Sequence, residues 1–242
     1  MKPCRYRVIT LGLALALLAS GCVTTGLSPR ESQYHYPGII AGLYRHNPGG
    51  PPPRQPRVPI RLAVAQLGEP APSQSFIQEI AQESSLVASV TGVPIAGGVT
   101  SHDRWNPSRN TIDLSEMESN LRGGLNLARD LGAQYLFVFG GAIDSYATMN
   151  PLAVFDLTLI GGCLVPGTTI HTEGKISGAL LDTESGRAVF LVSADHRKRR
   201  GAPTYFAEGE QKHHAVEVRD RLMSELAREF SAKLRQFETR GN

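Results

Sequence analysis

The fold is decided by residues 121–140, which read LRGGLNLARDLGAQYLFVFG. Their first half completes an apolar stripe at helical spacing, made of Leu114, Met117, Leu121, Leu125, Ala128 and Leu131. Gly132 follows where a left-handed glycine ends a helix. The next run, 133–140, is the most strand-like of the chain. This helix–glycine–strand unit predicts a strand in the middle of a sheet. Gly123 and Gly124 predict either close packing of the helix against another backbone or a weak helix.

Toward the N-terminus the ordered sequence begins at Ile60, where IRLAVAQ predicts a buried strand. A capping box at Ser75 to Gln78 predicts a helix whose apolar stripe runs to Val87. Gly92 and Pro94 end that helix, and the following VPIAGGV favours a short strand.

Toward the C-terminus the sequence predicts a hairpin and a long helix. Thr172–Leu181 and Ala188–Ala194 are the expected strands, with a turn at residues 182–186. Apolar residues then recur every three or four positions from Gly209 to Phe237. The order of elements predicts an α+β fold, with a mixed sheet of about four to six strands and helices packed mainly on one face.

The N-terminus has the three parts of a secretory signal. Lys2, Arg5 and Arg7 precede an apolar run that ends in Ser20-Gly21-Cys22. The run is too short for a permanent transmembrane helix. Cleavage directly before a cysteine resembles the bacterial lipoprotein signal, in which Cys22 is lipidated; the alternative is an ordinary signal with a coincidental cysteine. We therefore expect a signal peptide at 1–21 and a protein anchored by its lipid to the periplasmic side of the bacterial outer membrane.

Residues 22–59 are expected to tether the anchor to a single domain at 60–242. Six prolines lie between Arg45 and Pro59, which favours extended polyproline II. An island of tyrosines and aliphatic residues at 34–44 is either part of a disordered linker or a docking segment.

Charge and motifs exclude several functions. The chain has 25 basic and 22 acidic residues, and three basic residues lie in the leader, so the mature protein is balanced and no nucleic-acid partner is expected. No nucleophile elbow, zinc-protease motif or phosphate loop occurs in the sequence. His171 with Glu173, and His213 with His214, lack a third ligand at metal-binding spacing, so solvated histidines are expected. We expect no catalytic, cofactor or metal site.

Two segments are candidate contact surfaces. The basic run Arg197, Lys198, Arg199 and Arg200 is interpreted either as an exposed loop or as a contact for a polyanion or partner. Residues 151–170 are too apolar for an ordinary surface loop. They form either two core strands joined by Gly161-Gly162 or an exposed patch for a partner, a subunit or the membrane, carried by Phe155, Leu157 and Leu159.

The chain also carries two family resemblances. Residues 127–144 and 180–190 are similar to the periplasmic domain of the curli-secretion-channel family and to lipoprotein activators of penicillin-binding proteins. A lipidated cysteine, Tyr36-Pro37, Val58 to Ala65, Val165 to Gly167 and Asp182 to Phe190 resemble the rhombotarget lipoproteins. The second resemblance implies an outer-membrane lipoprotein of unestablished biochemical role that is not an enzyme.

Together these features predict a non-enzymatic, lipid-anchored binding and assembly module for cell-envelope or secretion machinery. The expected partners are the membrane, through the N-terminal lipid, and a protein or further copies of the chain. An oligomeric secretion-channel component and a periplasmic hydrolase remain as alternatives.

Overall fold

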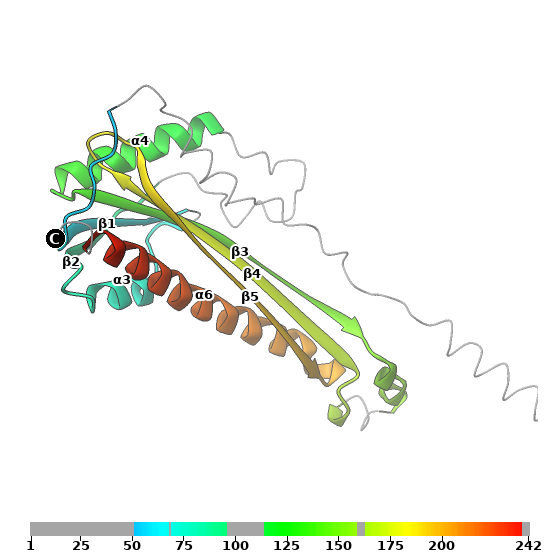
Figure 1. Ribbon diagram of the computed structural model, residues 1–242. Coiled ribbons are helices and arrows are strands. Elements are labelled where there is room, and N and C mark those ends of the chain that lie inside the picture. The colour runs from blue at the N-terminus through cyan, green and yellow to red at the C-terminus, as the bar shows by residue number, and fades with distance from the viewer. Residues whose placement is uncertain (1–50, 68, 96–113, 159–162, 239–242) are drawn as a thin grey trace, which may run out of the picture. The chain divides into compact units, whose positions relative to one another are not determined.

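The computed structural model describes residues 51–67, 69–95, 114–158 and 163–238. These residues form an α+β fold on a five-stranded mixed sheet with the order β2-β1-β3-β4-β5 (Figure 1). The strands are β1 (Ile60–Gln66), β2 (Val87–Gly92), β3 (Tyr135–Met149), β4 (Thr168–Asp182) and β5 (Ala188–Ala202). The helices are α3 (Gln74–Ala81), α4 (Leu114–Asp130) and α6 (Ala207–Glu238), with 3-10 helices η2 (Pro151–Leu157) and η3 (Thr204–Phe206). The predicted fold class, including the long C-terminal helix, is confirmed.

The chain divides into two compact units. We call the larger one the layered unit; its described residues lie in Glu31–Ile143, Gly174–His196 and Glu217–Asn242. We call the other the ribbon unit; its described residues lie in Asp144–Glu173 and Arg197–Val216. The strands β3, β4 and β5 and the helix α6 each contribute residues to both units, and each unit is described by itself below.

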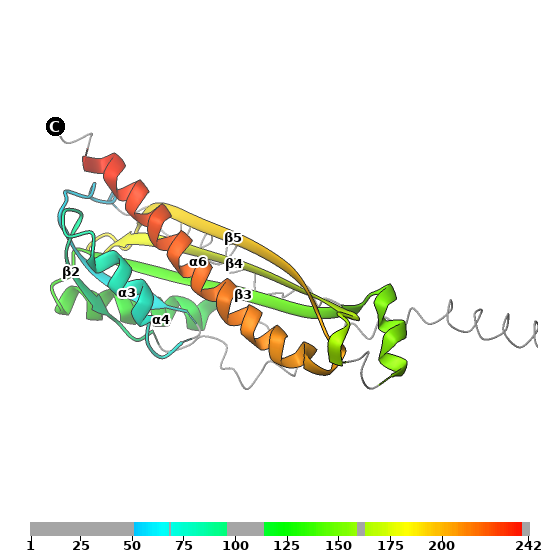
Figure 2. The ribbon, with the colours of Figure 1, turned by 90° about the horizontal axis from the view of Figure 1, so that it is seen from below.

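The layered unit places helices on both faces of its sheet, two on one face and one on the other. Strand β1 lies parallel to both β2 and β3, which puts β3 at the centre, as predicted. Helix α3 and the C-terminal part of α6 cover one face, and α4 covers the opposite face (Figures 1 and 2).

An aromatic cluster fills the core under α3 and α6. Phe76, Phe137, Phe139 and Phe230 are fully buried, and the ring centroids of Phe137 and Phe230 lie 4.7 Å apart. Gly178 on β4 lies directly beneath the ring of Phe137, and a β-carbon there would collide with that ring. The glycine therefore makes room for the aromatic side chain of the neighbouring strand.

The core under α4 uses smaller side chains. Ala63, Ala65, Ala179 and Ala188 are buried there, together with Leu121, Leu125 and Ala128 of α4. Leu131, which was expected to continue this apolar stripe, is 53% exposed. A β-carbon on Gly124 would lie 3.0 Å from Ile95, whereas one on Gly123 would meet no atom within 4 Å. Gly124 therefore packs closely, but against the side chain of Ile95 and not against another backbone as predicted, and Gly123 has no such neighbour. Gly132 ends the helix with a φ of 74°, as expected.

The segment before β2 differs from its prediction. Helix α3 begins at Gln74 after an N-cap at Ser73, whose side chain makes no capping hydrogen bond. The predicted capping box at Ser75–Gln78 is therefore wrong, because those residues already lie inside the helix. The helix ends at Ala81, and Val87 begins β2 instead of continuing the helical stripe. The strand in this region is β2, which ends at Gly92, before the strand expected at residues 93–99. Residues 93–95 are not in a strand, and residues 96–99 lie outside the described part.

Candidate functional site

The ribbon unit is built on the paired ends of three antiparallel strands. The hydroxyl oxygens of Ser145 and Thr172 lie 2.9 Å apart, and the Thr148 hydroxyl lies 3.2 Å from His171 Nε2. These cross-strand pairs fix the register of β3 against β4, and their reversed order along the two strands shows that the pairing is antiparallel. Both strands are longer than predicted. Their ends carry polar residues, so no apolar run in the sequence marked them as strand.

One face of the ribbon unit packs on the start of α6. Ile170, Thr172 and His214 are fully buried on this side, and Gln211 donates a hydrogen bond to the Ser145 carbonyl at 2.5 Å. His214 Nε2 lies 3.9 Å from Glu210 Oε2. The prediction of a solvated histidine is therefore wrong for His214, because the helical stripe turns this side chain toward the sheet.

The opposite face carries a cluster centred on His171. Its ring lies parallel to the ring of Tyr146, with centroids 4.9 Å apart and planes 4° apart. Arg199 Nε donates a hydrogen bond to His171 Nδ1 at 3.0 Å, and Arg197 Nε lies 3.7 Å from Glu173 Oε2. Tyr146, Arg199 and Thr148 thus position His171, whose side chain is half-buried.

The surroundings of His171 favour its neutral form. Burial lowers the pKa of His171, the Arg199 charge lowers it further, and Glu173 opposes the change. A ring whose Nδ1 accepts from Arg199 carries its proton on Nε2, and that N–H donates to the Thr148 hydroxyl. The cluster therefore has one consistent hydrogen-bond pattern when the imidazole is neutral.

The basic run forms the end of an edge strand. Arg197, Lys198, Arg199 and Arg200 all lie within β5, so the expectation of an exposed loop is wrong. Alternation along the strand turns Arg197 and Arg199 toward the face of His171 and Glu173. Lys198 and Arg200 point to the other face. The four charges are therefore divided between the two sides of the strand.

The connection after β3 is a 3-10 helix with exposed apolar side chains. Asn150 caps η2 by accepting from the Leu152 N–H at 2.9 Å, and its side-chain amide donates to the Pro166 carbonyl at 2.7 Å. The expected pair of core strands is wrong, because Pro151–Leu157 is helical. Phe155 is 51% exposed. The side chain of Leu157 and all of Leu159 lie outside what the structure describes.

A second connection, between β5 and α6, lies against the first. The hydroxyl oxygens of Thr168 and Thr204 are 3.0 Å apart, and a β-carbon on Gly201 would lie 3.3 Å from Pro166. The end of β3 and the two connections together expose seven large apolar side chains, which we call the apolar tip: Met149, Leu152, Val154, Phe155, Leu164, Tyr205 and Phe206. Sequence reasoning missed Tyr205 and Phe206, although two adjacent aromatic residues in a short polar connector were a usable signal.

The layered unit holds the end of the proline-rich segment in an ionic clasp. Arg54 donates to the buried Asp182 carboxylate through Nε at 3.0 Å, through its terminal nitrogen at 2.7 Å and through its backbone N–H at 3.2 Å. Ser185 donates to the same carboxylate at 2.8 Å. Burial raises the pKa of Asp182, but the hydrogen bonds from Arg54 and Ser185 outweigh it and lower the pKa overall. The clasp was not foreseen, because its partners lie 128 residues apart.

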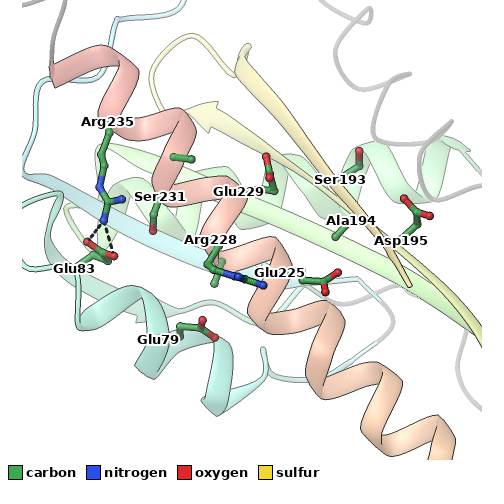
Figure 3. A pocket seen from close by; sticks show the side chains of 12 residues that line it. Glu79, Glu83, Ser193, Ala194, Asp195, Glu225, Arg228, Glu229, Ser231 and Arg235 are labelled. Carbon is green, nitrogen blue, oxygen red and sulfur yellow. Dashed lines mark hydrogen bonds and ion pairs between the residues drawn. The ribbon is translucent and has the colours of Figure 1, made fainter. Parts of the chain in front are cut away.

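An open groove of about 600 Å³ lies between α3, α6 and β5 in the layered unit (Figure 3). Its lining includes five carboxylates and two arginines: Glu79, Glu83, Asp195, Glu225, Glu229, Arg228 and Arg235. Arg235 holds both oxygens of Glu83 at 2.7 and 2.8 Å, and Arg221 holds Glu225 at 2.7 Å. The groove is therefore partly neutralised by ion pairs within the chain.

The described residues offer neither a metal-binding cluster nor a membrane-spanning helix. They contain no group of three or more histidine, cysteine or acidic side chains placed to hold a metal ion. None of their helices combines the length and apolarity needed to cross a membrane. The predicted lipidation site, Cys22, lies outside this part of the chain.

No protein-family model matches the chain, and no curated protein matches it. Among solved structures it is similar to a PelC dodecamer from Paraburkholderia phytofirmans, at 10% identity and a TM-score of 0.35, covering 73% of this chain and 91% of that one. It is also similar to a minor lipoprotein from Acinetobacter baumannii, at 7% identity and a TM-score of 0.35, covering 76% of this chain and 95% of that one. A third similar structure is a lipoprotein from Neisseria meningitidis, with 10% sequence identity and a TM-score of 0.23. That match covers 64% of this chain and 96% of the other chain. These likenesses are too distant to assign the chain to a family.

Proposed function

We propose that this chain is a lipid-anchored, non-enzymatic binding and assembly module on the periplasmic side of a bacterial outer membrane. In this proposal Cys22 carries the lipid, and the apolar tip of the ribbon unit docks a protein partner. The observation that supports the binding role is the gathering of seven exposed apolar side chains at the end of β3 and on two adjacent connections.

Single exposed apolar residues are ordinary, whereas a contiguous apolar patch marks an interaction surface. The tip includes three aromatic rings, and aromatic residues are enriched where protein interfaces bury most of their energy. Removing apolar surface from water is favourable by a free energy of about 25 cal/mol per Å².

The tip is also held in shape before any partner binds. Asn150 fixes both ends of the first connection, through Leu152 and Pro166, and Thr168 ties that connection to Thr204. A rigid surface loses less conformational entropy on association than a flexible loop does. This supports a docking role for the tip.

The same surface also supports the second candidate, an oligomeric secretion-channel component, if copies of the chain bury their tips against one another. A hydrolase is favoured by no arrangement of side chains in the described residues. The two binding candidates differ in the identity of the molecule that covers Phe155 and Phe206.

Crosslinking in the native membrane, followed by mass spectrometry, tests the proposal. The double variant Phe155→Lys/Phe206→Lys should keep the wild-type melting temperature, because both rings are exposed, and should lose the partner crosslink. Leu131→Lys, a change at an exposed leucine directly after α4, is the matched control and should keep the crosslink. Loss of a self-crosslink instead would support the oligomer. An unchanged crosslink pattern in the double variant would refute docking through the tip.

A further inference from the structure

We propose that residues 197–202 of β5 form a docking edge for an extended acidic segment of a partner protein, which adds to the sheet as a further strand. This inference concerns a surface other than the apolar tip and does not depend on the function proposed above. It rests on the juxtaposition of a sheet edge and four consecutive cations.

The first observation is the position of β5. It is the last strand in the order β2-β1-β3-β4-β5, and within the described residues only β4 pairs with it. An edge strand presents a row of backbone N–H and C=O groups on its outer side. An extended peptide can use these groups to pair with the edge, and its side chains then set specificity.

The second observation is the charge along this edge. Residues 197–200 are all basic, and alternation places two cations on each face of the strand. Side chains of an added strand alternate in the same way, so acidic residues on either of its faces would lie opposite a cation. Opposite charges on directly facing positions stabilise strand pairing, and like charges destabilise it.

Arg197 and Arg199 are already positioned by neighbouring side chains. Arg197 lies 3.7 Å from Glu173, and Arg199 donates to His171 at 3.0 Å. These contacts hold the arginine stems against β4 and reduce the side-chain ordering that a binding partner would otherwise require. The edge is therefore partly organised before a segment binds.

The charges also argue against a second copy of the chain as the occupant. If two such edges paired antiparallel with residues 197–200 in register, each run of four cations would face the other run. Basic residues on an edge are a known protection against this kind of self-pairing. The edge therefore excludes its own copies and selects a segment of opposite charge.

The test uses two synthetic peptides and the full chain with Cys22→Ser. The first peptide alternates glutamate and threonine. The second has the same sequence with every other backbone nitrogen methylated, which keeps the charge and removes the donors along one side. We expect the first peptide to bind and the second to bind roughly tenfold more weakly or worse. Binding of the first peptide should also protect backbone amides within 197–202 from hydrogen exchange.

Variants then locate the site. Lys198→Glu/Arg200→Glu should abolish binding of the first peptide, and the charge reversal Arg228→Glu on α6 should leave it unchanged. Equal binding of the two peptides would show a charge-only polyanion contact and overturn the proposal. Absence of binding, or protection elsewhere in the chain, would overturn it as well. Because the comparison of the peptides uses the unchanged edge, it holds even if a charge variant fails to fold.

Discussion

The ring of His171 on β4 lies parallel to the ring of Tyr146 on β3, with planes 4° apart. From the other neighbouring strand, β5, Arg199 donates a hydrogen bond to His171 Nδ1. This arrangement requires a neutral imidazole, because a protonated Nδ1 cannot accept the hydrogen bond and would place two cations together. Burial and Arg199 lower the pKa of His171, and the carboxylate of Glu173 only partly offsets them.

The first prediction concerns pH. An unfolded histidine has a pKa of about 6.5. Since the folded pKa lies below that value, the unfolded chain binds more protons, and stability falls as the pH drops from about 6.5 through the folded pKa. Melting temperatures measured across this range should fall less in His171→Gln than in the wild type. His213→Gln, a change at an exposed histidine, should retain the wild-type profile. An NMR titration that gives His171 a pKa above 6.5 would contradict the prediction.

The second prediction concerns the ionic clasp. Asp182 has a lowered pKa, so its stabilising effect is present above the unfolded pKa of about 3.9 and is lost as the pH falls through the lower folded value. At neutral pH, Arg54→Ala should cost about 2 kcal/mol, because it leaves a buried carboxylate with fewer donors.

Limited proteolysis should then reach residues 51–59 sooner in Arg54→Ala than in the wild type. Arg57→Ala, a change at an exposed arginine of the same segment, is the control. Equal cleavage of the two variants would mean that the clasp does not secure the segment.

The third prediction compares two glycines. Gly178→Ala should destabilise the chain by about 1–3 kcal/mol, because the new methyl group collides with the Phe137 ring in a packed core. Gly123→Ala meets no atom within 4 Å and should stabilise α4 by about 1 kcal/mol. Urea unfolding of both variants measures the difference. Opposite signs are expected, and the same sign in both would reject this account of the core.

The fourth prediction concerns the anchor. Cys22→Ala or Cys22→Ser should abolish acylation and leave an uncleaved or soluble form. Fractionation of membranes measures the result, and Cys163→Ser serves as the matched control that keeps its lipid. A Cys22 variant that still fractionates with the outer membrane like the wild type would refute the lipoprotein hypothesis.

Local signals predicted β1, α4 and β3 of the layered unit well, but not the segment before β2. Gly132 and the run at 133–140 identified α4, its end and the central strand, because helix stripes, left-handed glycines and apolar strands are all encoded within a few residues of one another. The strand at 60–66 was equally clear, since its neighbours Pro59 and Gly68 mark its ends.

The ribbon unit was harder to predict for physical reasons. The outer ends of β3 and β5 carry Asp144, Ser145 and the basic run, whose side chains give no apolar alternation, so the strands seemed to end early. Pairing between strands extends them, and that contribution is not local. The clasp between Arg54 and Asp182 depends entirely on long-range packing, which single-sequence patterns do not contain.

The clasp also has a mechanical consequence. Arg54 precedes Ile60 in the chain, so under the lipid anchor proposed above, tension from the N-terminus would reach Asp182 at the β4–β5 turn before it reached β1. A charge-assisted contact, in which two guanidinium N–H groups donate to one oxygen of Asp182, would thus bear the load first. The parallel pairing of β1 with β2 and β3 would be shielded from direct pulling until that contact breaks. Lowering the pH toward the pKa of Asp182 would weaken this first barrier, so the force needed to peel the N-terminal segment away depends on acidity.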